Sequence, residues 1–371
     1  MYIVYFLPTF VQYWLFGNSI SVSMSSRYVI RIYSSSEELP LLFDSDFFHS
    51  ATLFSAFECT VGSTPFMFVA YDREAVDRAM QAGEDPYVRQ HIAGQILAIL
   101  RRRKGILLPH LMTQGRIYGE GIYAEGVDKD AVFESLLNAI TEKFVKRLCL
   151  YVEFSNLSTK MFGYRIFRTR GFFPVRWMQI TNNIEERKGH GGSKGQGAEN
   201  VKGEPKGIRT CLAENKEQVA QFYTMMRNYY RFKLQRILPR RRFFEELQST
   251  FAQSDSHEDR HLTLLTLYKE KVIGGCTIVV NGKDAYLWYI AARRKVYKKY
   301  HPATLTVEHA LCIAEEIGVE HLHFMNTGIP FRRNAYREFL LQFGGTPSSS
   351  YRWFRVSIGW LNKLLRWIYR E

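Results

Sequence analysis

The sequence predicts an α/β protein in which helices pack on a mixed sheet, built as two similar halves. Apolar runs of strand length alternate with segments whose apolar residues repeat at helical spacing. The same order of strands, a helix and a strand occurs on both sides of one long break. That break, residues 187–207, holds seven glycines and five lysines or arginines in 21 residues. Such a composition is typical of a flexible linker or loop.

Length and composition bound the possible functions. The 371 residues are enough for two or more domains, and 46% hydrophobic with 23% charged residues excludes a disordered chain. The net charge of +14 favours an anionic partner such as nucleic acid, an acidic membrane surface or a phosphorylated substrate. The five cysteines form no C-x-x-C pair, which favours buried thiols in a reducing cytoplasm. No apolar run is long enough to span a membrane, and we expect residues 1–23 to be an N-terminal extension.

The first half, residues 24–186, contains one clear helix. It is predicted over 128–146, where Asp128 or Asp130 would cap it and Val132, Leu136 and Ile140 share a face. Strands are predicted around it at 65–71, 91–100, 147–154 and 171–180.

The second half, residues 208–356, repeats this order. Asn281-Gly282 between two apolar runs predicts a hairpin, and Gly318 ends a helix over 303–317. The other predicted helices are 217–230, 243–251 and 333–342, and the predicted strands are 261–268, 272–280, 285–291, 321–325 and 350–357. Residues 357–371 predict a basic amphipathic helix that either packs on the sheet or lies on an anionic membrane.

Several phrases of the second half carry a family resemblance. They are the 267–292 hairpin LYKEKVIGGCTIVVNGKDAYLWYIAA, the 301–318 segment HPATLTVEHALCIAEEIG, the 321–328 strand HLHFMNTG and the 338–347 ending EFLLQFGGTP. Together they resemble the acyltransferase fold of the GNAT superfamily. A tandem pair of such domains, over about 47–354, is similar to the Fem-type peptidoglycan aminoacyltransferases and the related CelD-like acyltransferases.

The resemblance implies two tandem GNAT-like domains and transfer of an acyl or aminoacyl group to an amine. The acceptor would be a cell-envelope precursor, lipid-linked or otherwise anionic, and the donor aminoacyl-tRNA or acyl-CoA, with no tightly bound cofactor. In this fold the amine attacks directly, and a backbone amide near Tyr289–Ala292 would meet the oxyanion. The stretch ARRKVYKKYHPATL at 292–305 lacks the glycines of the usual coenzyme A loop, and in this it resembles the tRNA-dependent Fem-type branch more closely.

The turn before the 303–317 helix is the candidate donor site. Cations beside free helix amides suit a phosphate, although a solvated basic turn has the same composition. The donor-binding candidates are Arg293, Arg294, Lys298 and Thr304.

Amide formation needs a group that takes a proton from the amine. Glu153 would have a raised proton affinity on an apolar strand, His301 stands at the helix start, and Tyr289 lies where the oxyanion is expected. Each is also compatible with a structural role. The spacing of His321 and His323 places both on one face of a strand, but it indicates no third metal ligand, so no metal site is predicted.

Further residues are candidates for the acceptor side. The segment 229–242 mixes aromatic residues with cations, which suits stacking and phosphate contacts but also an amphipathic helix. The substrate-binding candidates are His49, Tyr118, Glu120, Arg231, Lys233, Arg236, Asn326 and Arg332. The alternative function is a GNAT-fold protein that has lost catalysis and binds RNA or a membrane surface.

Overall fold

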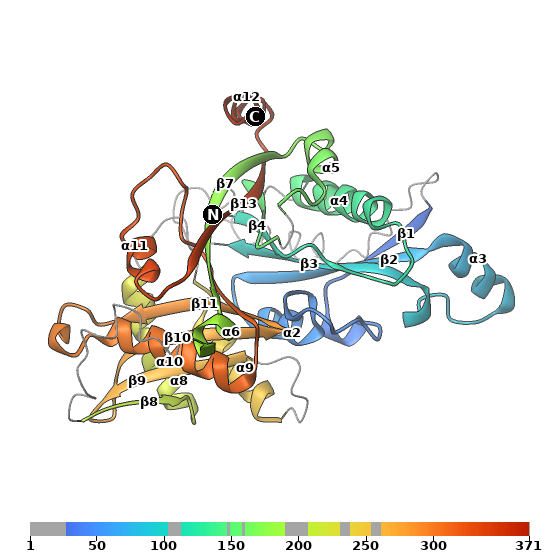
Figure 1. Ribbon diagram of the computed structural model, residues 1–371. Helices are drawn as coiled ribbons and strands as arrows, with labels where there is room; N and C mark the ends of the chain where they lie inside the picture. The colour runs from blue at the N-terminus through green and yellow to red at the C-terminus, as the bar shows by residue number, and fades with distance from the viewer. Residues whose placement is uncertain are drawn as a thin grey trace, which may run out of the picture.

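The computed structural model describes residues 27–102, 113–146, 149–157, 160–189, 207–230, 238–253 and 261–370. Within these ranges one large mixed sheet runs through the molecule, with helices on both faces (Figure 1). The predicted α/β class with a mixed sheet is therefore confirmed. The strands are β1 (Tyr28–Tyr33), β2 (Ser63–Asp72), β3 (Ile92–Arg102), β4 (Thr113–Tyr118), β5 (Ile122–Tyr123), β6 (Tyr151–Ser155), β7 (Phe173–Asn183), β8 (Ile208–Leu212), β9 (His261–Tyr268), β10 (Lys271–Asn281), β11 (Asp284–Ala292), β12 (His321–Phe324) and β13 (Thr346–Val356).

Ten α-helices and four short 3-10 turns accompany the sheet in these ranges. The helices are α2 (Ala51–Glu58), α3 (Arg73–Ala82), α4 (Lys129–Lys146), α5 (Tyr164–Thr169), α6 (Ile184–Gly189), α8 (Lys216–Tyr230), α9 (Arg241–Gln253), α10 (Pro302–Ile317), α11 (Ala335–Leu341) and α12 (Gly359–Ile368). The 3-10 turns are η1 (Ser36–Glu38), η2 (Phe47–His49), η3 (Arg89–His91) and η5 (Lys298–Tyr300). No helix in the described part of the chain combines the length and the apolarity that crossing a membrane requires.

The two halves share their central strands. The sheet order is β1-β2-β3-β4-β6-β13-β7-β12-β11-β10-β9-β8. The last strand of the chain, β13, pairs with β6 and β7 of the first half, and β7 in turn pairs with β12 of the second half. Each half thus places one strand inside the sheet of the other, and the paired strands β7 and β13 lie at the centre of Figure 1.

Three buried clusters hold these layers together. One lies under α4 and includes Phe133, Leu137 and Trp353, and a second lies under α10. The third joins the halves, because Phe48 of η2 packs against Tyr118 of β4 and Trp288 of β11, with ring centroids 5.4 and 5.6 Å apart. This aromatic contact fixes the two halves against each other beside the candidate site.

Most predicted elements are present within a few residues of their expected ends. Asp128 caps α4 as predicted, since its Oδ1 accepts from the backbone amides of Asp130 and Ala131. The predicted linker begins too early, because Arg187 belongs to α6 and its half-buried guanidinium pairs with Glu308 and Glu315 of α10. Residues 190–206 of that linker and the predicted extension 1–23 lie outside the described residues.

The cysteines differ in burial. Cys149 and Cys276 are buried, as their apolar strands predict, whereas Cys312 is exposed on α10. The prediction of burial is therefore wrong for Cys312, which lies on the solvent side of an amphipathic helix.

Candidate functional site

The parallel strands β11 and β12 separate at the centre of the second half. They are paired from Asp284 to Leu287, opposite His321 to Phe324. β11 then continues to Ala292 along β10, while the chain leaves β12 through Asn326, whose φ is +69°. A bulge accompanies the separation, because Leu287 faces Ile278 and Tyr289 faces Thr277, which leaves Trp288 as the extra residue. The β12-facing edge of β11 past Leu287 thus borders an opening in the sheet.

A basic turn leads from this opening to helix α10. Arg294, Lys295 and Lys298 are exposed in it, and His301 ends it in a left-handed conformation with φ +45°. Arg293 is half-buried, and the guanidinium of Arg294 lies 4.7 Å from the centre of the Phe339 ring. Because α10 starts directly after these cations, its positive dipole end and the side chains attract anions together.

The start of α10 is held tightly on the sheet. A Cβ on Gly274 of β10 would lie 2.5 Å from Thr306 Oγ1 and 2.9 Å from the Pro302 carbonyl oxygen. Thr306 Oγ1 of α10 also hydrogen-bonds the hydroxyl of Thr266 on β9 at 2.8 Å. Glycine at 274 is therefore required for this close approach, which fixes the helix end relative to the opened strands.

A buried cluster of arginines lies beside the opening. Glu153 of β6 is 3% exposed, and its two carboxylate oxygens accept from Arg116 of β4 at 2.8 Å and from Arg352 of β13 at 3.1 Å. Arg352 also donates to Asn326 Oδ1 at 3.0 Å and lies 3.9 Å from the centre of the Trp177 ring. A narrow cavity of about 30 Å³ borders this cluster, lined by Arg101, Gln114, Arg116, Tyr118, Tyr230, Leu238, Trp288, Tyr289 and Asn326.

Two tyrosines in the cavity differ in acidity. Burial alone would raise the pKa of Tyr118, but the guanidiniums of Arg101 and Arg116 and a hydrogen bond from Trp288 bring that pKa below its ordinary value. Burial raises the pKa of Tyr289 well above its ordinary value, although Arg101 hydrogen-bonds its hydroxyl. The site therefore contains one phenol whose pKa lies below its ordinary value and one whose pKa lies above it.

The structure brings four of the predicted site residues together: Glu153, Tyr118, Tyr289 and Asn326 surround the arginine cluster. The predicted surroundings of Glu153 are wrong, because its strand is buried but two guanidiniums, rather than apolar groups, contact its carboxylate.

The predicted donor residues form a separate group. Arg293, Arg294, Lys298 and Thr304 lie on the basic turn and the first turn of α10 and do not line the cavity. His301, predicted as a catalytic residue, lies with them at the start of α10 rather than at the cavity. Tyr289 and Asn326 connect the two groups, because they line the cavity and flank the opening between β11 and β12.

The remaining predicted residues lie apart from these two groups. Leu97 N–H and Gly121 N–H point at Nδ1 and Nε2 of fully buried His49, each at 3.0 Å, and burial lowers its pKa to about 3. Glu120 borders a cavity of about 380 Å³ together with Asp46, whose pKa burial raises to about 6. Arg332 is exposed in the loop before α11, and Arg231, Lys233 and Arg236 lie outside the described residues.

Arg101, Arg116 and Arg352 are absent from the sequence-based candidates. Their signal is a charged residue inside a strand that is otherwise buried, as in Thr113–Tyr118. Because the three arginines come from β3, β4 and β13, nothing local in the sequence indicates that they meet.

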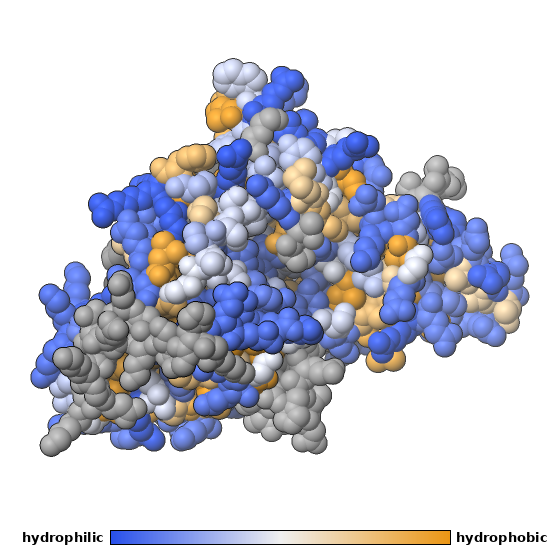
Figure 2. Space-filling model, viewed as in Figure 1, coloured by the Kyte–Doolittle hydropathy of each residue, from blue (hydrophilic) through white to orange (hydrophobic). Residues whose placement is uncertain are grey.

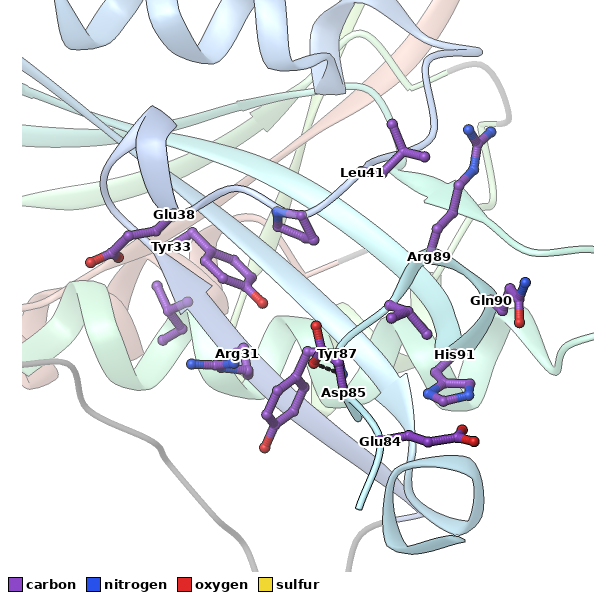
Figure 3. A pocket seen from close by; sticks show the side chains of 13 residues that line it. Arg31, Tyr33, Glu38, Leu41, Glu84, Asp85, Tyr87, Arg89, Gln90 and His91 are labelled. Atoms are coloured by element: carbon purple, nitrogen blue, oxygen red, sulfur yellow. Dashed lines mark hydrogen bonds between the residues drawn. The ribbon is translucent and has the colours of Figure 1, made fainter. Parts of the chain in front are cut away.

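A larger cavity lies far from this site. It measures about 840 Å³ beside β1, which seven strands separate from β11 in the sheet order. Figure 3 shows Arg31 beside Tyr87, with the guanidinium 4.0 Å from the ring centre. Arg89 and His91 are accompanied there by Glu38, Glu84 and Asp85, so the lining has mixed charge and selects no single class of ligand.

Comparison with known proteins agrees with this geometry. Residues 199–333 match the model of the acetyltransferase (GNAT) domain. The structure of FemX aligns with a TM-score of 0.54 at 11% identity, covering 86% of this chain and 94% of that one. A tandem GNAT protein from the clavulanic acid biosynthesis pathway aligns with a TM-score of 0.51 at 10% identity, covering 83% and 88%. No curated protein matches the sequence.

At these identities the structural likeness shows the fold. The chain has the tandem GNAT-like fold that the sequence predicts, and the resemblance to GNAT acyltransferases with a Fem-like tandem arrangement is confirmed. The domain match covers the opened strands, the basic turn and most of the second half.

Proposed function

We propose that this protein transfers an acyl or aminoacyl group to an amine, without a covalent enzyme intermediate. The observation that carries the proposal is the opening between β11 and β12, with a bulge at Trp288 and a basic turn leading into α10. A backbone amide within Tyr289–Ala292 is placed to stabilise the oxyanion of a tetrahedral intermediate. Transfer then needs a donor whose carbonyl reaches this opening.

The donor is an aminoacyl-tRNA or an acyl-CoA, neither of them tightly bound. Arg293, Arg294, Lys298 and Thr304 would contact its phosphates at the start of α10. The absence of the usual glycines from this turn favours the tRNA donor, while the match to the acetyltransferase domain favours the acyl-CoA. Both donors are polyanions and suit the +14 charge.

Proton transfer is assigned to the residues around the opening. The amine nitrogen attacks the donor carbonyl carbon, and the bond to the thiol sulfur or the ribose oxygen breaks. Tyr118, with its lowered pKa, suits the group that accepts the amine proton, and neutral Tyr289 suits the donor to the departing atom. Glu153 would act through Arg116, and His301 lies on the donor side.

The acceptor is proposed to be a cell-envelope precursor, lipid-linked or otherwise anionic. Asn326 and Glu120 lie on its side of the opening, Arg332 would contact it from the surface, and His49 would support the Gly119–Gly121 turn. Arg231, Lys233 and Arg236 are retained as candidates, because Tyr230 and Leu238 on either side of them line the cavity. A chain that binds RNA or membrane without catalysis is the alternative.

Helix α12 supports a position at the cytoplasmic side of an inner membrane. It projects from the body of the molecule, with apolar and basic side chains next to each other (Figures 1 and 2). Trp360 and Trp367 are each 70% exposed, and Ile368 is 55% exposed. Asn362 anchors the helix by donating to the Gly171 carbonyl and accepting from Val356 N–H. Tryptophan beside Lys363 and Arg366 is typical of a helix that lies in an anionic membrane interface.

A radiolabelled transfer assay tests the proposed activity. Purified full-length protein is incubated with charged tRNA or acetyl-CoA and an extract of envelope precursors, and label in amide-linked product is measured. Transfer from either donor, lost in Tyr289→Ala, supports the proposal. Donor binding without any transfer favours the non-catalytic alternative.

Co-sedimentation with anionic vesicles tests the membrane position. Full-length protein is compared with a chain truncated after Ser357 and with a Trp360→Ala/Trp367→Ala variant. Loss of sedimentation in both variants supports the role of α12. Equal sedimentation of all three, or none by the full-length chain, contradicts it.

A further inference from the structure

Helix α12 has two faces with different surroundings. Asn362 and Arg366, one turn apart, face the body of the molecule, where they donate to the carbonyls of Gly171 and Arg168 at 2.9 and 3.3 Å. The exposed large apolar side chains of the helix share the other face by their spacing, and they are Trp360, Leu364, Trp367 and Ile368. One side of α12 is therefore anchored by polar contacts, and the other is free to enter an apolar phase.

A second arginine lies next to Arg366 on the anchored side. Arg355, near the end of β13, is half-buried, and its Nη1 donates to the Arg170 carbonyl. Burial, and after it the positive charge of Arg366, lowers the pKa of Arg355. A Cβ on Gly171 would lie 3.8 Å from both the Arg355 guanidinium carbon and the Asn362 amide nitrogen. Strand β13 and helix α12 thus bring two like charges to the single turn that follows α5.

Within the part of the chain that the structure describes, neither guanidinium has a carboxylate partner. The hydrogen bonds of Arg355 and Arg366 go to main-chain carbonyls, and Glu134 of α4 pairs instead with the Arg170 side chain at 2.7 Å. A carbonyl accepts one of the five N–H groups of a guanidinium and carries no full charge, so it orients the cation without neutralising it. The pair therefore keeps N–H groups and charge for an anion with several oxygens.

We infer that Arg355 and Arg366 bind the phosphate of an anionic phospholipid headgroup when α12 lies on a membrane. The inference rests on the membrane position proposed above and adds to it one specific headgroup contact. A phosphate suits the pair, because its oxygens accept from two guanidiniums at once in charge-assisted hydrogen bonds. Its negative charge also offsets the repulsion between the two cations.

The surroundings of the pair favour a lipid over a free anion. An interfacial helix lies with its apolar face at the boundary between headgroups and acyl chains. Because a helix is about 10 Å wide, its other side then lies at the level of the headgroup phosphates. Asn362, which also accepts from Val356 N–H, keeps that side on the body and holds Arg366 beside Arg355. One surface thus offers apolar contact for acyl chains and paired cations for the headgroup.

The test compares two kinds of anionic vesicle that differ in the chemistry of the headgroup. Phosphatidylcholine vesicles contain either phosphatidylglycerol, which presents a phosphate, or oleate, which presents a carboxylate, at matched zeta potential. Binding of the full chain is measured by co-sedimentation and Trp fluorescence. Arg355→Gln/Arg366→Gln removes the pair. Lys363→Gln/Arg370→Gln is the matched control, because it removes two exposed cations at the same end of the chain.

The full chain is expected to bind phosphatidylglycerol vesicles about tenfold more tightly than oleate vesicles. Arg355→Gln/Arg366→Gln should bind the two kinds of vesicle equally. Lys363→Gln/Arg370→Gln should bind both more weakly and keep the preference, because it lowers only the general attraction to negative charge. If Arg355→Gln/Arg366→Gln does not fold, Arg366→Gln decides alone, since Arg366 is exposed.

Three results overturn the headgroup site and leave the membrane position of α12 in place. They are equal binding of both vesicles by the unaltered chain, an unchanged preference in Arg355→Gln/Arg366→Gln, and an equal loss of preference in Lys363→Gln/Arg370→Gln. Binding of neither vesicle overturns the site and the membrane position together, while the radiolabelled transfer assay still decides the activity. A preference for phosphatidylglycerol in a protein that transfers no acyl group sustains the site and removes the proposed activity.

Discussion

In the first half of the molecule the parallel strands β4 and β6 stay paired from Gln114–Tyr151 to Tyr118–Ser155, whereas β11 and β12 of the second half separate after Leu287. The helices that follow β4 and β11 also differ in the charge at their N-terminal ends. Asp128 caps α4 with a carboxylate, while a basic turn precedes α10 and no side chain caps it. An anion is therefore repelled from the start of α4 and attracted to the start of α10.

The difference teaches how one fold takes two roles. The closed strand pair of the first half supports the arginine cluster, since Arg116 and Glu153 face each other across β4 and β6. The open pair of the second half leaves backbone groups accessible. Because β13 carries Arg352 from the second half into the first, the two roles meet at one cavity.

The largest expected effect is a loss of stability when the buried ion pairs of the first half are broken, compared with the partly exposed ion pairs of the second half. Glu153→Ala leaves Arg116 and Arg352 without their carboxylate, and breaking a buried pair costs about 3–5 kcal/mol. Urea unfolding measures the loss. Asp284→Asn is the control, because its pairs with His321 and His323 are partly exposed and are worth about 1 kcal/mol or less. Equal losses in the two variants would contradict the importance of the buried cluster.

The next effect is the loss of stability at acidic pH that one buried histidine in each half should cause. Burial lowers the pKa of His49 and of His261 to about 3, so between pH 6.5 and pH 3 the unfolded chain binds protons that the folded chain does not. Stability is complete above pH 6.5 and falls as the pH falls, by about 2 kcal/mol per histidine at pH 5. The free energy of unfolding at pH 7 and pH 5 measures this loss.

Substitutions separate the two histidines. His261→Phe should remove its share of the pH dependence at little cost, because neither ring nitrogen has a partner among the described residues. His49→Phe should also cost stability at pH 7, because the neutral imidazole accepts from one of the two facing amides, of Leu97 or Gly121, and that amide loses its acceptor. An unchanged pH dependence in His261→Phe would show that this histidine is not buried in the neutral form.

Charge reversal tests the asymmetry of the two helix starts. Arg293→Glu/Arg294→Glu should weaken binding of acetyl-CoA or charged tRNA at least tenfold, about 1.4 kcal/mol, because two cations of the proposed donor site become anions. Equilibrium binding at moderate salt measures the change. Lys129→Glu, at the start of α4, is the matched control and should leave donor binding unchanged. Equal effects of the two changes would remove the donor site from the basic turn.

The smallest effect concerns helix capping. Asp128→Ala should destabilise the protein by about 1 kcal/mol, because the amides of Asp130 and Ala131 lose their acceptor. His301→Ala should change stability by less than about 0.5 kcal/mol, since the His301 side chain caps nothing and φ stays positive. Thermal unfolding compares the two, and a larger loss in His301→Ala would contradict the assignment.

The sequence predicts those parts of the fold whose side chains follow one period. Helix α4 and strand β9 appear at nearly their observed ends because their apolar residues repeat without interruption. Strand β4 is missed, because Gln114 and Arg116 interrupt its apolar pattern although both are buried. Their burial depends on partners from β6 and β13, which local patterns do not contain.

One part of the candidate site can likewise be predicted from the sequence, and another part cannot. The basic turn is contiguous in the sequence, so Arg293 and Arg294 are found from composition and position. The arginine cluster depends on the insertion of β13 between β6 and β7. The hydrogen bond from Arg352 to Glu153, for example, joins residues that are about 200 positions apart in the sequence. Tyr118 is a substrate-binding candidate from the sequence, but its lowered pKa follows from cations that only the fold brings close.

Amide hydrogen exchange of the full chain, with and without donor, tests most directly whether the second half alone binds the donor. Acetyl-CoA and charged tRNA are compared as separate additions. Slower exchange at Tyr289–Ala292, in the basic turn and in the first turn of α10, with no change at the start of α4, is the predicted result. Protection at the start of α4 or along β4 and β6, without protection at α10, would contradict the division of roles between the halves.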